Sequence, residues 1–164
     1  MTGPALLAFQ VYGRPAPQGS KRALGPGRMV EMSRHVKPWR EDVRAAALSY
    51  LPAGWVPLDE PLVVRMTFTL AKPASAPKKR QTWPMRTPDL SKLVRATEDA
   101  MTTAGVWRDD ARVVDLRAVK AYPDEGYDAL SRPGAVIRVW VLEDFRSPSE
   151  QGKAAGAAEL GGAA

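Results

Sequence analysis

The sequence predicts an α/β or α+β domain in which a small mixed sheet of about four strands packs against two main helices. The chain has 164 residues, which suits one domain with a single core. Its composition, 45% hydrophobic and 26% charged, is typical of a globular protein. Apolar segments with strand-like or helical spacing follow in the order strand, helix, strand, helix, strand, strand. We place the domain at residues 1–145 and expect the Gly/Ala-rich tail, residues 146–164, to be disordered.

The first half of the chain predicts a strand, a basic loop and a helix. Residues 5–12 are apolar and partly aromatic, and a glycine and a proline end this strand. Residues 13–37 form a basic segment punctuated by Gly and Pro, in which residues 29–32 are expected to pair as a short strand. Apolar residues at helical spacing then predict a helix from Pro38 to Leu51.

The second half predicts three strands, a long loop and a helix. β-Branched and aromatic residues are concentrated in residues 62–70, the clearest strand in the chain. The loop that follows holds four prolines and several basic residues, and a loop of this length in a small domain is usually functional or disordered. A helix is expected from about Asp89 to Ala104, with Gly105 as its C-cap residue. Residues 112–121 and 135–142 are the last two strands.

Charge and cysteine content limit the partners and the compartment. Lys and Arg outnumber Asp and Glu by 24 to 18, and the resulting charge of +6 favours a polyanionic partner through counterion release. A surplus of this size is equally compatible with solubility alone. There is no apolar run near the roughly 20 residues that a membrane helix needs, no basic leader, and no cysteine. We therefore expect a cytoplasmic protein without membrane contact.

The single histidine argues against mechanisms that depend on a catalytic histidine. His35 lies between Arg34 and Lys37, whose positive charges are expected to lower its pKa, and no acidic residue is nearby in sequence to orient it. A Ser-His-Asp triad is therefore not expected, and His35 is interpreted as a surface or DNA-facing residue. Any hydrolytic chemistry is left to carboxylates and a metal ion.

Two acidic points flank the second helix. Asp89 follows Thr-Pro at its start, and Asp109 and Asp110 lie in the turn after its end. On the residues alone Asp89 is better explained as an N-cap than as a ligand, and the acidic pair can be explained as an ordinary turn before a strand. The two points are separated by about the length of the helix, at ~1.5 Å per residue, so they need not meet within one chain. They could meet across a symmetric dimer.

The same segment carries a family signature. It reads Pro88 to Arg95 (PDLSKLVR), then Asp99-Ala100, then Gly105 to Asp110 (GVWRDD), and a strand that reaches Lys120. This order and spacing resemble the RusA family of Holliday junction resolvases, with its Pro-Asp-Leu-Asp-Asn-Leu-x-Lys run, a following Asp-Ala and a Gly-x-x-x-Asp-Asp turn. More loosely, the resemblance extends over residues 6–142.

The resemblance implies a homodimer that binds four-way or other branched DNA in recombination and repair. It implies acidic residues that bind Mg²⁺, with Mn²⁺ as a substitute, and hydrolyse phosphodiester bonds. Asp89 matches the first acid of the motif, Asp110 the metal-binding acid of the turn, and Asp109 its neighbour, which is expected to support the turn or the metal. Hard divalent cations prefer such oxygen ligands.

Two positions depart from the family pattern. Ser91 stands where the family has a second catalytic Asp, and Arg95 stands where it has a Lys that assists at the phosphate. Glu98 shares a helix face with both and is a candidate for the missing charge, although a surface ion pair with Arg95 is the simpler interpretation. Asp99 matches a family position and is equally well explained as structural. Because Ser91 is neutral, the alternative function is a branched-DNA-binding protein with weak or no cleavage.

Basic residues predict the path of the phosphate backbone. They cluster before the first helix and in the long loop, where Trp83 is expected either to stack on an unpaired base or to pack against a dimer partner. The predicted DNA-binding residues are Arg14, Lys21, Arg22, Lys78, Lys79, Arg80, Arg86, Lys92 and Lys120.

Overall fold

A computed structural model describes residues 3–19, 21–23, 26, 29–31 and 34–142, with the backbone alone for 21–23 and 29–31. The predicted tail, residues 146–164, lies outside the described residues. The expected order of strands and helices is confirmed, with a two-stranded hairpin before the first helix. The elements are β1 (Leu7–Tyr12), β2 (Lys21–Ala23), β3 (Met29–Glu31), α1 (Val36–Tyr50), β4 (Leu62–Thr69), α2 (Leu90–Ala104), the 3₁₀ turn η1 (Asp110–Arg112), β5 (Val113–Ala121) and β6 (Gly134–Val141).

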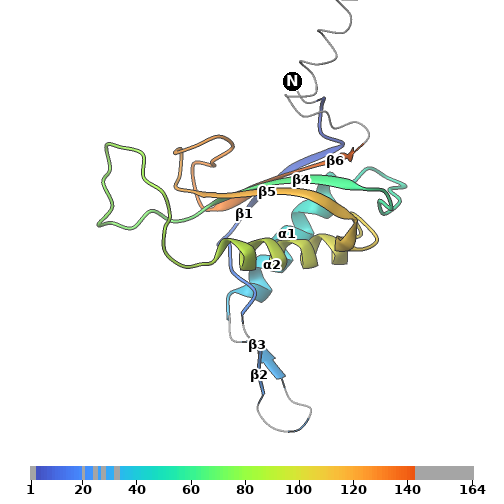
Figure 1. Cartoon of the computed structure of the whole chain (residues 1–164), viewed down its shortest axis with the longest axis horizontal. Helices are drawn as coiled ribbons and strands as arrows, with labels where there is room; N and C mark the ends of the chain where they lie inside the picture. Colours follow the sequence, from blue (N-terminus) through green and yellow to red (C-terminus); the bar gives the residue numbers. More distant parts are fainter. Residues whose placement is uncertain (1–2, 20, 24–25, 27–28, 32–33, 143–164) are drawn as a thin grey trace, which may run out of the picture.

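The main sheet has four strands and is mixed, as predicted. Its order is β1-β6-β4-β5, and β6 pairs antiparallel with both β1 and β4. β4 and β5 are parallel, and α2 lies in the connection between them, as a parallel pair requires. The hairpin of β2 and β3 projects away from the sheet on the side of the helices (Figure 1).

Both helices cover one face of the sheet, and the core lies between them and the strands (Figure 1). Trp39 of α1 is fully buried, and its ring centroid is 6.5 Å from that of Phe68 on β4. Its indole Nε1 donates to Thr97 Oγ1 at 3.1 Å, and Thr97 donates in turn to the Leu93 carbonyl at 2.9 Å. The polar groups of this helix contact are therefore satisfied, and α1 fixes the position of α2.

The helix boundaries differ from the predicted ones for simple reasons. α1 begins at Val36 rather than at Pro38, because a proline is tolerated within the first turn, where its missing N–H has no partner to lose. α2 begins at Leu90 with Asp89 as N-cap, and it ends at Gly105, whose φ of 76° is the left-handed conformation expected of a C-cap glycine. None of the described helices is long and apolar enough to cross a lipid bilayer.

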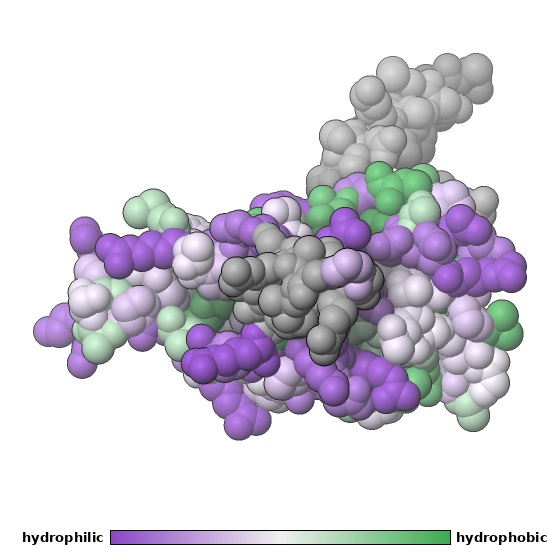
Figure 2. Space-filling view, turned by 90° about the horizontal axis from the view of Figure 1, so that it is seen from below, coloured by the Kyte–Doolittle hydropathy of each residue, from purple (hydrophilic) through white to green (hydrophobic). Residues whose placement is uncertain are grey.

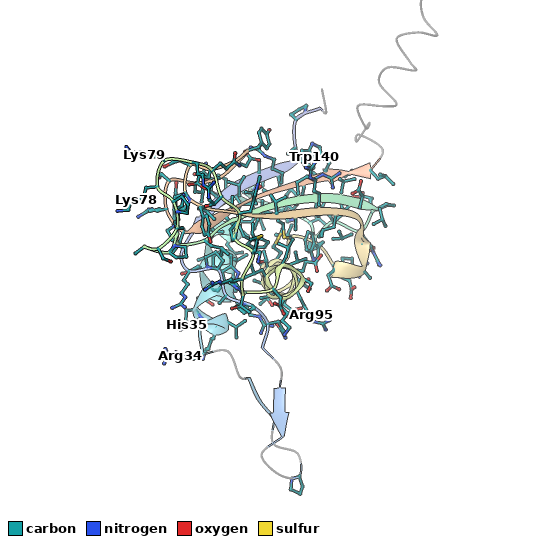
Figure 3. The ribbon with its side chains drawn as sticks, turned by 60° about the vertical axis from the view of Figure 1, so that its left-hand side comes forward. Arg34, His35, Lys78, Lys79, Arg95 and Trp140 are labelled. Atoms are coloured by element: carbon teal, nitrogen blue, oxygen red, sulfur yellow. The ribbon has the colours of Figure 1, made fainter. Side chains whose placement is uncertain are left out.

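Among the described residues, no helix covers the other face of the sheet. A hollow of about 680 Å³ lies there, between the sheet and residues of the N-terminal segment and two loops. Three arginines line it, namely Arg65, Arg117 and Arg138, together with Trp83, Tyr127 and Trp140. We call this the open-face hollow. Figure 3 shows Trp140 on this side of the sheet and Arg95 on the opposite side, at α2.

Candidate active site

One face of α2 forms the floor of a second hollow. Ser91, Arg95 and Glu98 follow each other at four and three residues, which places them on one side of a helix. The opposite side of α2 is buried in the core. The hollow has a volume of about 410 Å³, and we call it the α2 hollow. Its lining consists of Gln18, Gly19, Ser91, Lys92, Arg95, Glu98 and Asp110.

Asp110 reaches this hollow because the turn after α2 is held firmly. Leu58 holds the turn through two backbone hydrogen bonds. Its N–H donates to the Val106 carbonyl at 3.1 Å, and its carbonyl accepts from the Arg108 N–H at 2.9 Å. The Asp59 carboxylate accepts from Arg108 at 2.9 Å and from Arg112 at 2.7 Å. These hydrogen bonds, that from Arg112 first, hold the pKa of Asp59 below its usual value. Asp59 therefore remains charged and anchors both sides of η1.

Asp109 supports the turn. Its Oδ1 accepts a hydrogen bond from the Ala111 N–H at 2.8 Å, as an N-cap residue of a helical turn does. This contact is the turn-supporting one that the sequence suggested. Asp109 is not part of the lining of the α2 hollow.

The loop after β1 closes another side of the hollow. The Gln18 N–H donates to the Lys92 carbonyl at 2.9 Å, and the Gln18 side chain accepts from Arg40. Arg40 also donates to Asp99 at 2.6 Å. Asp99 therefore joins α2 to α1 and to this loop. This is the structural role that the sequence offered as one explanation of Asp99, beside its match to a family position. Gln18 was not among the predicted site residues, because only the fold brings it to α2.

The two carboxylates of the α2 hollow influence each other. Glu98 is half-buried, and its pKa is raised to about 7, first by burial, then by the negative charges of Asp110 and Asp99, while Arg95 acts in the opposite direction. Among the described residues no cation lies within 4 Å of the Glu98 carboxylate. The surface ion pair with Arg95, which the sequence favoured, is therefore not formed.

Comparisons with known proteins decide the family. The family model for endodeoxyribonuclease RusA matches residues 12–129, more than two thirds of the chain. The chain belongs to the RusA family. Its members are Holliday junction-resolving endodeoxyribonucleases, which hydrolyse phosphodiester bonds of DNA and depend on a divalent metal. The chain is thus assigned to a class of nucleases that bind DNA as substrate.

Individual relatives agree with the RusA assignment. The crossover junction endodeoxyribonuclease of Enterobacteria phage 82 is 59% identical over 32 residues, which are 20% of this chain and 27% of that protein. The RusA enzyme of Escherichia coli strain K12 matches to the same extent. A Bacillus subtilis protein, YqaN, is 27% identical over 128 residues, which are 73% of this chain and 89% of that protein. Strong similarity is thus confined to a short segment, within a weaker similarity of most of the chain.

The fold brings only some positions of the RusA motif together in the α2 hollow. Three of its positions, Ser91, Arg95 and Asp110, lie together in the α2 hollow of a single chain, so they need no partner subunit to meet. Asp89 is not among the lining residues. It is the N-cap residue of α2, as predicted, but its carboxylate makes no capping hydrogen bond and lies 3.4 Å from Lys92 Nζ instead.

Oxygen donors in the α2 hollow fit a hard divalent ion. Glu98 and Asp110 offer two carboxylates and Ser91 a hydroxyl, while a Mg²⁺ ion retains several waters and needs few protein ligands. Within the part of the chain that the structure describes, no three His, Cys, Asp or Glu side chains converge on one point. Ligation at this site would therefore rest on two carboxylates and on oxygens of other kinds.

The predicted DNA-binding residues are distributed over two sides of the site. Lys78 and Lys79 lie at the outer end of the loop between β4 and α2 (Figure 3), and Arg80 and Arg86 of this loop are exposed as well. Arg14 is exposed after β1. Seen from the helix side, hydrophilic residues cover much of the surface, next to paler and some hydrophobic ones (Figure 2). The side chains of Lys21 and Arg22 lie outside the description.

Lys120 and Lys92 have contacts of their own. Lys120 Nζ donates to the carbonyls of Arg86 at 2.9 Å and Pro88 at 3.0 Å, and so holds the chain that leads into α2. This explains the lysine at the end of the strand in structural terms. Lys92 lines the α2 hollow beside its ion pair with Asp89.

His35 and Trp83 lie away from the carboxylates. His35 is the N-cap of α1 and accepts a hydrogen bond from Arg34 Nε at 3.1 Å, and its pKa is lowered by desolvation and by the charges of Arg14 and Arg34. The predicted direction of this shift is confirmed. Trp83 is 58% exposed and lines the open-face hollow, on the far side of the sheet from the α2 hollow.

Proposed function

We propose that this chain is a Mg²⁺-dependent, structure-selective endonuclease that resolves four-way junctions and related branched DNA. The observation that carries the proposal is the α2 hollow, where three positions of the RusA motif come together with a second carboxylate. Family membership favours cleavage over the alternative of binding without cleavage. The compartment in which we expect this activity is the cytoplasm.

The chemistry is that of a phosphodiester hydrolysis at a carboxylate site. A bound divalent cation supplies a polarised phosphoryl oxygen and a water of lowered pKa. Asp110 is the residue that we assign to hold it, and the Ser91 hydroxyl lies beside it as a neutral oxygen donor. Arg95 binds the phosphate through its planar guanidinium, which suits a phosphate clamp better than proton transfer. The metal roles of Asp89 and Asp109 stay predictions.

DNA and a second copy of the chain are the partners that we propose. The exposed cations of the long loop would follow the phosphate backbone, whose binding releases counterions. A homodimer would present two α2 hollows to a substrate with two-fold symmetry. Support for such a dimer comes from β5, an edge strand of the sheet on which Val114 is 59% and Leu116 is 39% exposed.

A junction-cleavage assay tests the proposal. The purified chain is incubated with a labelled synthetic four-way junction in Mg²⁺, in Mn²⁺ and in EDTA, and sedimentation analysis gives its oligomeric state. We expect cleavage that EDTA abolishes and that Asp110→Asn reduces by at least about 100-fold, which is the effect of removing one transition-state contact in other enzymes. Asp124→Asn is the matched control, because it removes one carboxylate from an exposed turn outside the hollow.

Two results would contradict the proposal. Tight junction binding without cleavage in either metal would select the branched-DNA-binding alternative. Cleavage that survives Asp110→Asn would move the chemistry out of the α2 hollow.

A further inference from the structure

The chain departs from the RusA pattern at one position and carries an unexpected acid at another on the same helix face. Ser91 replaces an acidic residue of the motif, and Glu98 follows seven residues later, two helical turns along. The structure puts both side chains in the α2 hollow, together with Asp110. The hollow has therefore lost a carboxylate at one end of its floor and holds one at the other end.

The placement of Glu98 is costly for a residue without a partner. A half-buried carboxylate that faces a second carboxylate is destabilised by desolvation and by repulsion. Lys92 and Arg95 line the same hollow, but no described cation forms an ion pair with the Glu98 carboxylate. Asp99, which also faces Glu98, is neutralised by Arg40 at 2.6 Å. Among the described residues, neither Glu98 nor Asp110 forms an ion pair.

The rest of the site holds these two carboxylates in place. Asp59 fixes the turn that presents Asp110 through Arg108 and Arg112. Glu98 lies in the middle of α2, whose other side is locked into the core by Thr97 and Trp39. Neither backbone position can withdraw easily, and a cation between the two side chains would relieve the repulsion while both remain charged.

We propose that Glu98 supplies the second carboxylate of the divalent-metal site, in place of the acid that is missing at Ser91. The inference rests on the proposed metal-dependent cleavage. It assigns to Ser91 a neutral contact to the ion, its water or the phosphate. Glu98 would then supply the negative charge that an acid at the position of Ser91 would bring.

The decisive experiment exchanges the two positions and measures the binding of Mg²⁺ alone by calorimetry, in the full chain without DNA. Glu98→Gln should weaken Mg²⁺ binding by about 10- to 100-fold, at least the cost of losing an outer partner of a metal site. The double variant Glu98→Gln with Ser91→Asp should recover most of this loss. Glu98→Ala, with and without Ser91→Asp, repeats the test for the case that glutamine distorts the hollow.

Control variants and cleavage keep the two proposals separate. Glu41→Gln removes the same charge from an exposed position on α1 and should leave Mg²⁺ binding unchanged. Junction cleavage is measured in parallel. A wild-type chain that neither binds Mg²⁺ nor cuts would refute the proposed function itself.

Other outcomes bear on Glu98 alone. If the wild-type chain binds Mg²⁺ and cuts, and Glu98→Gln binds the ion equally well, Glu98 is not a ligand. If binding is weakened but Ser91→Asp restores none of it, Glu98 does not take over the role of the missing acid. Circular dichroism and urea unfolding of each variant establish that the fold is retained.

Discussion

The two faces of the sheet treat like charges in opposite ways. On the open face, Arg65 is in register with Arg117 on one neighbouring strand and with Arg138 on the other, so three guanidinium groups stand in a row. Asp115 bonds Arg65 through both its oxygens, at 2.9 and 3.2 Å, and Asp128 bonds Arg138 at 2.9 and 2.7 Å. Like charges opposite each other on a sheet are destabilising, and here two of three are neutralised by bidentate pairs.

On the helix side, two acids of the α2 hollow form no ion pair with a described cation, although Lys92 and Arg95 line the same hollow. Glu98 and Asp110 face one hollow, and no described cation pairs with Glu98. The nearby carboxylates that have structural roles, Asp59 and Asp99, are each bound by arginine. The contrast is that the acids with a structural role, Asp59 and Asp99, have arginine partners within the chain, whereas the two acids that we propose as metal ligands have none among the described residues.

The largest expected effect is on the rate of junction cleavage, compared between two variants that each lose one arginine on one side of the sheet. Arg95→Met should reduce the single-turnover cleavage rate of a four-way junction by about 100-fold, because it removes a phosphate contact from the α2 hollow. Arg117→Met changes the same residue type in the open-face hollow and should leave the rate unchanged. Equal losses in both variants would remove the functional distinction between the faces.

The free energy of unfolding should respond differently when one acid is neutralised on each side of the sheet. Asp128→Asn should lower the free energy of unfolding by about 1–2 kcal/mol, because it disrupts a partly buried, charge-assisted pair with Arg138. Asparagine also tolerates the φ of 61° at this position. Glu98→Gln should cause no such loss at pH 8. Urea unfolding of both variants in EDTA measures the difference, and a comparable loss in Glu98→Gln would show that Glu98 has a structural partner.

A smaller effect concerns pH. The folded state raises the pKa of Glu98 from 4.5 to about 7, so between these values the folded chain binds more protons than the unfolded chain. Its contribution to stability is fully present below about pH 4.5 and is lost as the pH rises through about 7.

The measurement for pH is the difference in free energy of unfolding between the wild type and Glu98→Gln, in EDTA, at pH 5 and pH 8. The wild type should lose stability relative to the variant as the pH rises. Taking the difference cancels the opposite trends of groups such as Asp59 and Asp115, whose pKa values are lowered. A difference that does not change with pH would mean that Glu98 titrates normally.

The smallest effect is on the salt dependence of junction binding. Lys78→Gln should reduce the slope of log K against log salt concentration by about 0.9, the amount for one phosphate contact. Arg117→Gln, on the open face, should leave the slope unchanged. Binding of the junction by fluorescence anisotropy at several salt concentrations measures both, and an unchanged slope for Lys78→Gln would exclude the long loop from the phosphate path.

Much of the fold follows from local patterns in the sequence. The four strands of the main sheet and both helices were predicted, because apolar spacing and caps are properties of neighbouring residues, as Gly105 illustrates at the end of α2. The start of α1 was misplaced by two residues, since a proline in the first turn does not mark the first helical residue. The site motif was found in the same way, because its spacing is contiguous along the chain.

Local reasoning was insufficient where contacts join distant segments. The residues around Asp59 in the sequence do not predict its ion pairs with Arg108 and Arg112, some fifty residues away. Gln18 reaches α2 through Arg40 and the Lys92 carbonyl, a placement that depends on the packing of α1. Lys120 donates to the carbonyls of Arg86 and Pro88, a structural contact that the sequence did not predict, and its predicted contact with DNA stays a prediction.

The sequence by itself therefore determined the family, the order of the elements and the positions at which the motif is intact or altered. Tertiary structure alone decided which acids share a hollow, because helix packing and a braced turn set the distances between charges, and distance and burial set their interaction. Asp89 is therefore not part of the lining of the α2 hollow, whereas Glu98 is.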